Sequence, residues 1–562
     1  MQATSSTSAA RRGTRTRRLL TGALLGALTA AVALAVGEIT AIFTGPASAP
    51  VYAVGAAAVS LTPAPVKEYA VAHFGEHDKQ LLITGILAAL AVIALLAGVA
   101  ALRRFPLGAL LITLFGAVGV AAAESQPDSA AAWALHSVLG AVAGIGALRL
   151  LVLLYRRTPA AAGDLAHPHS HDDTTDIDAT DTDQASAPAV IPVPTLPMSA
   201  VPATVAGSDR RRFVTTAAGI AVGSAAAGFG ANLVIARRYN VEAARAAVRI
   251  PRPAFPAPAL PPGVHPNVAG LSPFFTGNDG FYRVDTALVL PQVRPDSWSL
   301  RIHGLVDKPI ELSFADLLRQ PLHEHDMTLS CVSDPVGGPY VGNARWIGAS
   351  LPDLLRAAGV QRGADQLLAR STEGMSIGTP LSSILDGRPG LIALAMNGEP
   401  LPIAHGFPAR MLVPGFYGYA SACKWVTDLY VTTFAASTAY WAARGYARIG
   451  TMKTQSRIDV PKPFARVSAG PVTVAGVAWA THRGIAEVQV RVDQGEWHSA
   501  RLAAQDGPDT WRQWTYPWQA TTGSHSLQVR AADATGQYQT STRADPYPNG
   551  ASGWESVIVT VT

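Results

Sequence analysis

Long apolar runs alternate with short basic clusters in the first 157 residues. Four runs, at 19–43, 81–102, 107–123 and 130–155, come close to or exceed the about 20 residues that a helix needs to cross a bilayer. Arginines cluster at 11–18, 103–104 and 156–157. Because basic clusters favour the cytoplasmic side, we expect a transmembrane helical domain over 1–157 that weaves in, out, in, out and in.

The first run has a second interpretation. A basic stretch followed by an apolar run is also typical of a cleavable secretory signal. The run from Leu19 is long, and no persuasive small-residue cleavage site follows it, which favours a span. Whether the mature chain keeps this span stays open.

Residues 158–207 change the pattern completely. They are rich in Ala, Pro, Asp and Thr, and such a composition cannot bury a core. We therefore expect a disordered cytoplasmic linker. His167, His169 and His171 could bind metal adventitiously, but a solvated linker accounts for them as well.

A fifth apolar segment, predicted over 208–238, begins with Asp209-Arg-Arg-Arg-Phe-Val-Thr215. Paired arginines, one residue, Phe and a weakly hydrophobic run resemble a twin-arginine export signal, although Asp209 stands where Ser or Thr is usual. An ordinary span with a basic flank is the alternative. Both interpretations place the chain after Arg238 outside the cytoplasm.

The remaining chain alternates between shorter elements. We expect a Pro-rich tether at 239–273, a mixed α+β domain at 274–450 and a β-sandwich at 451–562. The predicted elements of the first domain are a strand at 299–303, a capped helix at 313–318 and a helix at 351–358 with Pro352 in its first turn. Those of the second are strands at 471–479, 485–492, 511–518 and 526–532.

Composition supports a membrane protein of several domains. Of 562 residues, 49% are hydrophobic and only 15% are charged, and the mean hydropathy is +0.21. The isoelectric point of about 9.2 does not indicate nucleic-acid binding, because much of the Lys and Arg flanks apolar runs. Two cysteines are too few for an exported disulfide scaffold.

One of these cysteines stands in a distinctive place. Cys331 follows the apolar stretch Met327 to Leu329 and precedes a loop rich in Gly and Pro. This predicts a strand end that presents one sulfur to a pocket, and thiolates ligate soft metals. A buried, inert cysteine is the alternative.

Later motifs favour the first interpretation. Met396-Asn-Gly-Glu-Pro-Leu-Pro402, His405-Gly-Phe-Pro-Ala-Arg410, Val413-Pro-Gly415 and Lys424-Trp425 resemble the molybdopterin core of the sulfite oxidase family. Ala344 to Leu351 and the strand with Cys331 also fit. The resemblance covers about 274–562 and implies a sulfite-oxidase-like molybdopterin domain followed by an immunoglobulin-like domain often used for dimerisation. A homodimer is therefore expected.

The resemblance also implies roles for single residues. Cys331 would be the protein's thiolate ligand to molybdenum, and His405, Arg410 and Lys424 would hold the pterin and its phosphate. Phe281, Tyr282 and Arg283 match a segment at the pocket mouth, with Arg283 as the catalytic cation nearest an oxyanion substrate. Thr372 would face the cofactor. Cys423 would pack as a small hydrophobe whose backbone touches the pterin, and no Cys331–Cys423 disulfide is expected.

Two departures from the family concern the substrate. Sulfite oxidases follow the ligand cysteine with a Gly-Asn-Arg-Arg type segment, whereas no cation follows Cys331 until Arg345. They also place a Tyr where this chain has Leu394. Losing a buried cation and a hydroxyl beside a doubly charged substrate costs on the order of a thousandfold in specificity, so the substrate stays unassigned.

The membrane half offers candidates for electron exchange. His136 lies within the fourth run, and His73 and His77 lie just before the second. They could ligate haem b or shape a quinone site, or else pack at the lipid interface.

The leading interpretation is a membrane-anchored molybdenum oxidoreductase that transfers oxygen atoms outside the cytoplasm and exchanges electrons with a quinone or another redox partner. An S- or N-oxide reductase fed by quinol is the alternative within enzymes. A cofactor-free anchored binding protein is the alternative outside them, and the spans hold too few polar residues for a transporter.

Overall fold

The computed structural model describes residues 3–63, 66, 69–70, 73–74, 78–126, 131–157 and 204–562. The chain forms two compact units: Met1–Thr44, Ile86–Ala121 and Ala132–Val234 make the first, and Gly45–Gly85, Ala122–Ala131 and Ile235–Thr562 make the second. The predicted linker up to residue 203, with its three histidines, and His77 lie outside the described residues.

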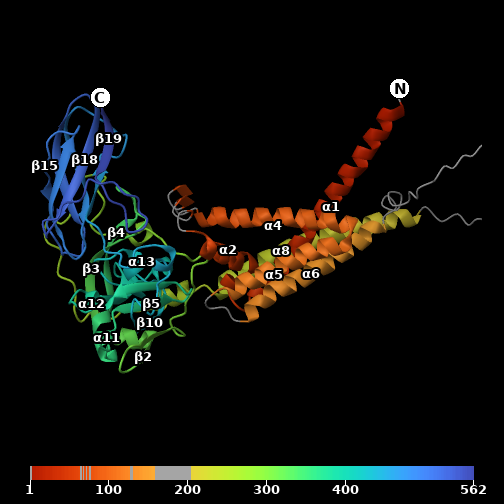
Figure 1. The fold of residues 1–562 in the computed structure, drawn as a ribbon, viewed down its shortest axis with the longest axis horizontal. Helices are drawn as coiled ribbons and strands as arrows, with labels where there is room; N and C mark the ends of the chain where they lie inside the picture. Colours follow the sequence, from red (N-terminus) through yellow and green to blue (C-terminus); the bar gives the residue numbers. More distant parts are fainter. Residues whose placement is uncertain are drawn as a thin grey trace, which may run out of the picture. The chain divides into compact units, whose positions relative to one another are not determined.

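Long helices build the first unit (Figure 1): α1 (Ala3–Ala41), most of α4 (Asp78–Arg103), α5 (Phe105–Glu124), α6 (Ala132–Arg156) and most of α8 (Thr204–Arg238). In the described chain, five helical stretches are long and apolar enough to cross a membrane: Arg15–Ala41, Lys79–Arg103, Phe105–Glu124, Ala132–Arg156 and Arg210–Ala247. Each contains one of the predicted runs almost completely, because a long apolar stretch satisfies its backbone hydrogen bonds best as a helix.

Small residues let the helices of this unit approach closely. A Cβ atom on Gly98 of α4 would lie 2.0 Å from the carbonyl oxygen of Gly22 in α1, and one on Gly26 would lie 1.9 Å from the carbonyl oxygen of Ala94. Glycines four residues apart on one helix face are a typical contact of membrane helices. Substitution there would force α1 and α4 apart.

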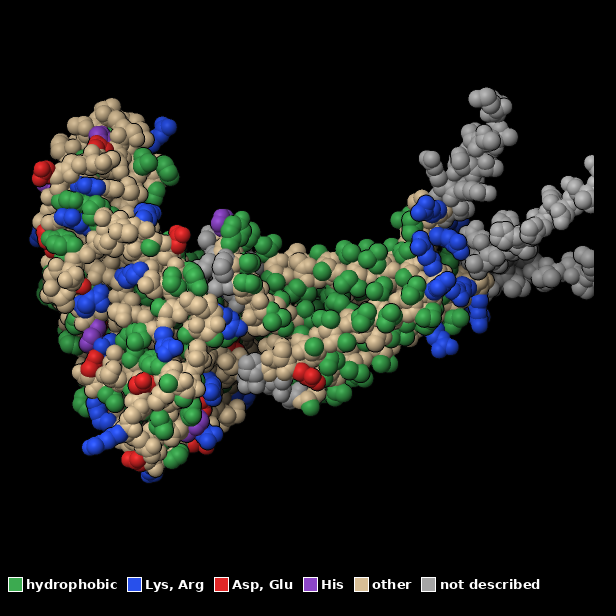
Figure 2. Space-filling model, viewed as in Figure 1, with side chains coloured by type: hydrophobic (Ala, Val, Ile, Leu, Met, Phe, Trp, Pro, Cys, Tyr) green, Lys and Arg blue, Asp and Glu red, His purple; other side chains and the backbone are tan. Residues whose placement is uncertain are grey.

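Basic side chains gather at one end of the same unit, while its flanks are largely apolar (Figure 2). The exposed arginines concerned are Arg15, Arg17, Arg18, Arg103, Arg104, Arg156, Arg157, Arg210, Arg211 and Arg212. They belong to the start of α1 and α8 and to the end of α4 and α6. The helices thus alternate in direction, as the predicted topology requires.

Helix α2 (Pro50–Leu61) belongs to the second unit and was not predicted from the sequence. With 12 residues it is too short to cross a bilayer. Arg444 Nη2 donates a hydrogen bond to the carbonyl oxygen of Ser60 at 3.0 Å. This helix is therefore docked on the part of the chain that follows residue 235.

Residues 299–432 form two sheets around a shared core. One sheet has the order β2-β1-β10-β5-β6, and the other has the order β3-β4-β7-β8 with β9 on the free part of β7. The strands are β1 (Ser299–Gly304), β2 (Ile310–Ser313), β3 (Leu322–Ser330), β4 (Val341–Ser350), β5 (Gln366–Ser371), β6 (Ser376–Pro380), β7 (Leu391–Met396), β8 (Glu399–Pro400), β9 (Arg410–Leu412) and β10 (Val426–Thr432).

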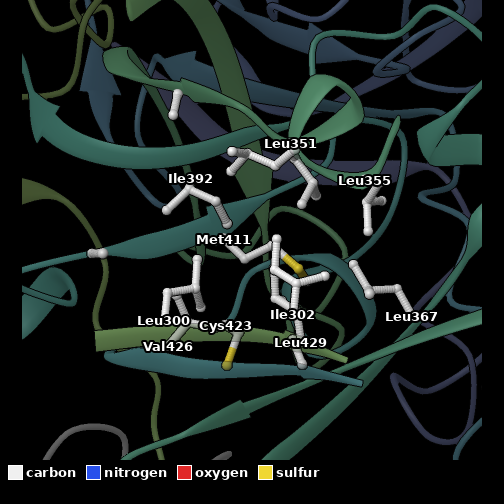
Figure 3. Close-up of a cluster of buried hydrophobic side chains, with 14 of the residues drawn as sticks. Leu300, Ile302, Leu351, Leu355, Leu367, Ile392, Met411, Cys423, Val426 and Leu429 are labelled. Atoms are coloured by element: carbon white, nitrogen blue, oxygen red, sulfur yellow. The ribbon is translucent and has the colours of Figure 1, made fainter. Parts of the chain in front are cut away.

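The core lies between the two sheets (Figure 3). Leu300, Ile302, Leu367 and Leu429 come from the first sheet, and Ile392 and Met411 come from the second. Leu351 and Leu355 of helix α11 (Leu351–Ala358) complete it. Helix α10 (Phe314–Leu318) carries the predicted cap, because Ser313 Oγ accepts from the Asp316 N–H at 3.1 Å. The predicted α+β domain is thereby confirmed in outline.

A tight hairpin joins β7 to β8. Met396 pairs with Glu399, so Asn397 and Gly398 form a two-residue turn, with φ of 51° and 83°. Asn-Gly is the preferred dipeptide there because both positions need positive φ. The Met-Asn-Gly-Glu motif is therefore a turn, and its Asn397 Nδ2 donates to the carbonyl oxygen of Thr276 at 2.9 Å.

Residues 455–561 form two facing sheets, of order β11-β13-β17-β16 and β12-β19-β18-β14-β15. The strands are β11 (Gln455–Val460), β12 (Arg466–Val467), β13 (Gly470–Trp479), β14 (Ile485–Val492), β15 (His498–Ser499), β16 (Arg501–Leu502), β17 (Arg512–Ala520), β18 (Gly523–Asp533) and β19 (Glu555–Val561). Val474 and Trp514 of one sheet pack against Val488, Val529 and Val557 of the other. This is the predicted β-sandwich.

The predicted tether, 239–273, is not a loose connector. Helix α9 (Glu242–Ala247) is fixed by Arg245, whose Nε donates to the carbonyl oxygen of Leu401 at 2.9 Å. Phe255 pairs with β3, since its N–H donates to the Leu322 carbonyl at 3.1 Å. Val264 and Leu271 are buried. Apolar residues between the prolines thus pack on both following domains, which composition alone did not reveal.

Candidate functional site

A cavity of about 380 Å³ gathers most of the residues singled out in the sequence. It is lined on its polar side by Tyr282, Asp285, Cys331, Glu373, Arg410, Cys423 and Lys424. These come from the loop before β1, the end of β3, the turn after β5, the start of β9 and the segment before β10. Residues far apart in the chain therefore meet at the ends of strands from both sheets.

Cys331 stands directly after β3, as expected. Its N–H donates to the carbonyl oxygen of Tyr340 at 2.9 Å, and its Sγ lies 3.3 Å from Ser333 Oγ. The side chain is buried yet lines the cavity. Cys331 and Cys423 are both free thiols in this structure.

Arg410 is a buried cation with little to neutralise it. Its Nη1 donates to the carbonyl oxygen of His405 at 3.4 Å, and its guanidinium lies over the Trp346 ring at 5.4 Å. Its Nε is buried without a hydrogen-bond partner, and no carboxylate of the described residues pairs with it. Burial lowers the pKa of Arg410 to about 10. Such an arginine is expected to bind an anion.

Lys424 is paired with the carboxylate of Asp285, which belongs to no sequence motif. Lys424 Nζ donates to Asp285 Oδ2 at 2.7 Å and to the carbonyl oxygen of Ala404 at 3.2 Å. Lys79 also donates to Asp285, and to the carbonyl oxygen of Ala287 at 2.7 Å. Burial lowers the pKa of Lys424 to about 8, although Asp285 opposes this shift.

Arg283 is not among the residues that line the cavity, and its Nε donates to Asp285 Oδ2 at 2.9 Å. Its expected role as the cation nearest an oxyanion substrate stays a prediction. Burial alone would raise the pKa of Asp285, but Lys424, Lys79 and the hydrogen bond from Arg283 outweigh burial and hold it well below its usual range. The physical reason is that a fully buried carboxylate attracts every cation within reach.

Tyr282, one of the three residues expected at the pocket mouth, lines the cavity. Burial raises the pKa of its hydroxyl, with a further contribution from nearby Cys331. Phe281 points elsewhere: its ring packs edge-on against Trp346 and against His405. Phe281 therefore packs against residues next to the cavity and does not line it.

His405 also lies behind the cavity wall. Its Nε2 is 3.1 Å from the carbonyl oxygen of Asn278, and Asn278 Oδ1 accepts from Asn397 at 2.9 Å. Burial lowers the pKa of His405 to about 4, helped by Arg410. The neutral imidazole of His405 thus contacts the loop that carries Tyr282. The backbone carbonyl oxygen of His405 accepts the hydrogen bond from Arg410.

Thr372 and Glu373 follow β5. The Thr372 N–H donates to the carbonyl oxygen of Trp425 at 3.0 Å, while its Oγ1 is buried and unpartnered. Thr372 is outside the cavity lining, but Glu373 is part of it and its Oε2 is also buried without a partner. Burial, aided by Asp285, raises the pKa of Glu373 to about 7.

Cys423 matches the expected small hydrophobe. Its sulfur lies in the core near Val426 and Leu429 (Figure 3), and burial raises the pKa of its thiol. Residues 410–426 thus include both core positions and cavity positions, and Cys423 belongs to both. Asp285, Glu373 and the lining residues from 59–82 were missed, because none belongs to a motif.

The two departures from sulfite oxidases persist in three dimensions. Arg345 pairs with Asp326 through Nε at 2.8 Å and Nη2 at 2.7 Å, and it does not line the cavity. Leu394 is fully buried in the core. Neither position supplies a cation or a hydroxyl to the cavity.

The membrane-side histidines have local partners. His136 Nε2 lies 2.7 Å from Thr44 Oγ1 within the first unit, and His136 Nδ1 is buried without a partner. His73 is exposed and stacks on Tyr69. Their role in binding haem or quinone stays a prediction.

Residues 287–441 match the family model described as the oxidoreductase molybdopterin binding domain. The fold and site therefore define an oxidoreductase domain that holds molybdopterin. The "Uncharacterized oxidoreductase YuiH" of Bacillus subtilis is 35% identical over 149 residues, which cover 26% of this chain and 72% of that protein. The chain thus belongs to the sulfite oxidase family of molybdopterin-dependent oxidoreductases, and the resemblance seen in the sequence is confirmed.

Mitochondrial sulfite oxidase of Drosophila melanogaster is 32% identical over 327 residues, or 50% of this chain. The chain spans only 56% of the length of that relative. Among solved structures, the sulfane dehydrogenase SoxCD from Paracoccus pantotrophus is similar at 26% identity and a TM-score of 0.44, over 49% of this chain and 78% of that one.

The residues present fit a molybdenum–molybdopterin cofactor. Cys331 can offer one soft thiolate at the cavity, and the pterin dithiolene would supply further sulfur ligands to the metal. Buried Arg410, with an unpartnered Nε, suits a ligand that carries a phosphate.

Proposed function

We propose that this chain is a membrane-anchored molybdenum–molybdopterin oxidoreductase that catalyses two-electron oxygen-atom transfer outside the cytoplasm. The observation that carries the proposal is the meeting of Cys331, Arg410 and Lys424 at one cavity. A soft thiolate at one wall and two buried cations at another are what a metal bound to a phosphorylated organic ligand requires.

Each residue has a definite task in this proposal. Cys331 supplies the thiolate, with Ser333 Oγ at 3.3 Å to stabilise its charge. Arg410 and Lys424 bind the phosphate and pterin edge, and Asp285 holds Lys424 in place at 2.7 Å. Tyr282 places a protonated hydroxyl on the polar wall, beside Cys331 and Arg410. When bound, the cofactor supplies the two-electron redox chemistry at which an oxygen atom is gained or lost.

Membrane anchoring rests on the first unit. Its helices include stretches with the length and hydropathy of membrane spans, and exposed arginines gather at one end of them. We assign that end to the cytoplasm. The segment 208–238 then carries the chain across, either as a twin-arginine signal or as an ordinary span, and leaves the cavity domain outside. Substituting Arg210 and Arg211 by Lys distinguishes the two, since only a twin-arginine route loses export.

A second candidate, reduction of an S- or N-oxide, is favoured by the charge of the cavity. Lys79 and Lys424 are both paired with Asp285, and Arg345 is paired with Asp326. Among the described residues that line the cavity, Arg410 is therefore the one cation left without a carboxylate partner for a dianionic substrate such as sulfite. A neutral oxide meets no such requirement.

Metal analysis tests the proposal first. We expect about one molybdenum per chain in the wild type, and loss of the metal and of at least 1,000-fold in turnover in Cys331→Ser, roughly what removing a metal ligand costs. Cys423→Ala is the matched control and should retain the metal, because this second thiol also borders the cavity but burial raises its pKa and so disfavours the thiolate. Sulfite, methionine sulfoxide, trimethylamine N-oxide and nitrate then identify the substrate class. Wild-type protein without molybdenum, made in a host that synthesises the cofactor, would contradict the proposal.

A further inference from the structure

Part of the cavity lining, here called the outer wall, comes from residues that lie before the second predicted span or at its start, and outside the family match. Apolar side chains from this segment dominate that wall: Val59, Val66, Ala70, Phe74, Leu81 and Leu82. Met375, Ile377 and Trp441 face the cavity from the molybdopterin domain. An enzyme that handles only small polar oxides needs no such wall, because it adds apolar surface that those substrates do not use.

The outer wall is fastened to the domain at two points. Arg444 donates to the carbonyl oxygen of Ser60 at 3.0 Å, and Lys79 donates to Asp285 and to the Ala287 carbonyl. Asp285 is also the partner of Lys424. Lys79 and Lys424 are therefore linked through one carboxylate, and the cavity is complete only with the six apolar side chains of the outer wall in place.

The two walls together describe an amphipathic ligand. Tyr282 and Glu373 contribute polar atoms to the cavity lining, and the apolar residues named above contribute aliphatic and aromatic groups. Leu81 and Leu82 belong to the first turns of the apolar stretch Lys79–Arg103, which has the length and hydropathy of a membrane span. A ligand with an apolar tail would therefore meet apolar side chains at the start of this helix, where they line the cavity.

Glu373 adds a specific chemical requirement. Its Oε1 accepts weakly from Thr286 Oγ1 at 3.4 Å, and its buried Oε2 has no partner among the described residues. An unpartnered carboxylate oxygen at a cavity is suited to accept a hydrogen bond from a ligand hydroxyl. Because burial brings its pKa to about 7, the same carboxylate can also take up the proton of that hydroxyl.

We propose that the outer half of this cavity binds the head group of a membrane quinol, with Glu373 as the acceptor for a quinol hydroxyl. The inference rests on the proposed function and adds the electron donor to it. Oxidation of one quinol to the quinone releases two electrons and two protons. Reduction of one S- or N-oxide to the sulfide or amine and water consumes the same number of each, so no further reductant is required.

Photolabelling of the full chain in lipid nanodiscs tests the proposal. The probe is an azidobenzoquinone with a decyl tail, and mass spectrometry of the peptides maps the label. We expect label on peptides that contain residues 59–82 or Trp441, and protection by excess decylubiquinol. Decylbenzene, which has the tail without the quinone oxygens, should protect at least tenfold less.

Three variants sharpen the test. Val59→Trp fills the outer half of the cavity and should reduce labelling at least tenfold. Leu61→Trp is the matched control, because Leu61 is 82% exposed and does not line the cavity. Glu373→Gln keeps the volume of the side chain and should weaken quinol protection about tenfold through loss of a charged acceptor. Because Gln has nearly the same volume as Glu, the Glu373→Gln variant still tests the site if Val59→Trp fails to fold.

The outcomes separate this inference from the proposed function. Wild-type chain without molybdenum contradicts the proposed function, whatever the label shows. Chain that contains molybdenum but is labelled only outside residues 59–82 and 441, or equally in Val59→Trp and Leu61→Trp, overturns the quinol site alone. Equal protection by decylbenzene overturns the quinol class, because the polar wall would then contribute nothing.

Discussion

Lys424 Nζ lies 2.7 Å from Asp285 Oδ2, although 139 residues separate the two in the chain. The same carboxylate accepts from Lys79 and from Arg283, and its side chain is 1% exposed. One buried anion therefore fixes a proposed cofactor residue, a residue of the pocket loop and the start of an apolar helix. The site depends on Asp285 more than on any single cation around it.

Replacing this anion should have a large effect on stability. Asp285→Asn leaves Lys424 and Lys79 without their buried counterion, and we expect a loss of about 3–5 kcal/mol in unfolding free energy. Chemical denaturation of the detergent-solubilised chain measures it. Asp296→Asn is the matched control, since Asp296 also pairs with an arginine two residues earlier but at the surface. It should unfold like the wild type, and equal losses in both variants would contradict the role of burial.

Arg410 should show opposite effects on cofactor content and on stability. Arg410→Met removes a buried charge that lacks a carboxylate partner, so cofactor-free protein should become more stable by about 1 kcal/mol or more. The same variant should lose most of its molybdenum in a host that makes the cofactor.

Arg457→Met provides the contrast for Arg410. Arg457 Nε donates to buried Asp459 at 2.8 Å. Removal of the arginine leaves that carboxylate buried without its counterion. We expect a destabilisation of about 3–5 kcal/mol. The denaturation midpoints of the two cofactor-free variants are compared with that of the cofactor-free wild type. Destabilisation by Arg410→Met would show that the guanidinium already has sufficient hydrogen-bond partners without a ligand.

Gly406 should matter for geometry beyond its own backbone. Its φ is +113°, and a Cβ atom there would lie 3.1 Å from Lys424 Cα and 3.2 Å from Arg410 Cβ. Gly363 has a φ of +90° but open space around it. Gly406→Ala and Gly363→Ala should each lose roughly 1 kcal/mol through backbone strain, yet only Gly406→Ala should reduce the molybdenum content. Similar molybdenum content in the two variants would show that the close approach at Gly406 does not affect cofactor binding.

Stability of the β-sandwich should depend on pH through Glu555. Burial raises its pKa to about 7, while the unfolded chain loses the same proton near pH 4.5. Between these values the folded state binds more protons, so stability falls as the pH rises, by on the order of 3 kcal/mol. Glu555→Gln should abolish this part of the slope, and its stability gain over wild type should grow from pH 5 to pH 8.

Glu487 supplies the opposite sign as a control for Glu555. The hydroxyl of Tyr538 holds the pKa of Glu487 below its usual value, so its contribution is present above that value and lost in acid. Glu487→Gln should therefore leave the slope between pH 5 and pH 8 unchanged. The same slope in all three proteins would contradict the assignment to Glu555.

Local pattern was enough to predict many elements. Strand β14 (Ile485–Val492) and helix α11 (Leu351–Ala358) have the predicted bounds, because alternation and helical spacing record which side of an element is buried. The apolar runs became long helices for the same reason. Motif resemblance also identified Cys331, Arg410 and Lys424, since each is fixed by a short stretch around it.

The tertiary structure decided what surrounds those residues. Arg283 turned from the cavity toward Asp285, Lys79 reached the same carboxylate from 206 positions away, and residues 239–273 packed where a tether was expected. Val59, Val66 and Phe74 became part of the cavity lining. Periodicity shows that a face is buried but not which distant segment covers it, and ion pairs follow distances that only the folded chain sets. The sequence therefore determined the elements and the proposed ligand residues, while tertiary packing determined their partners and the shape of the site.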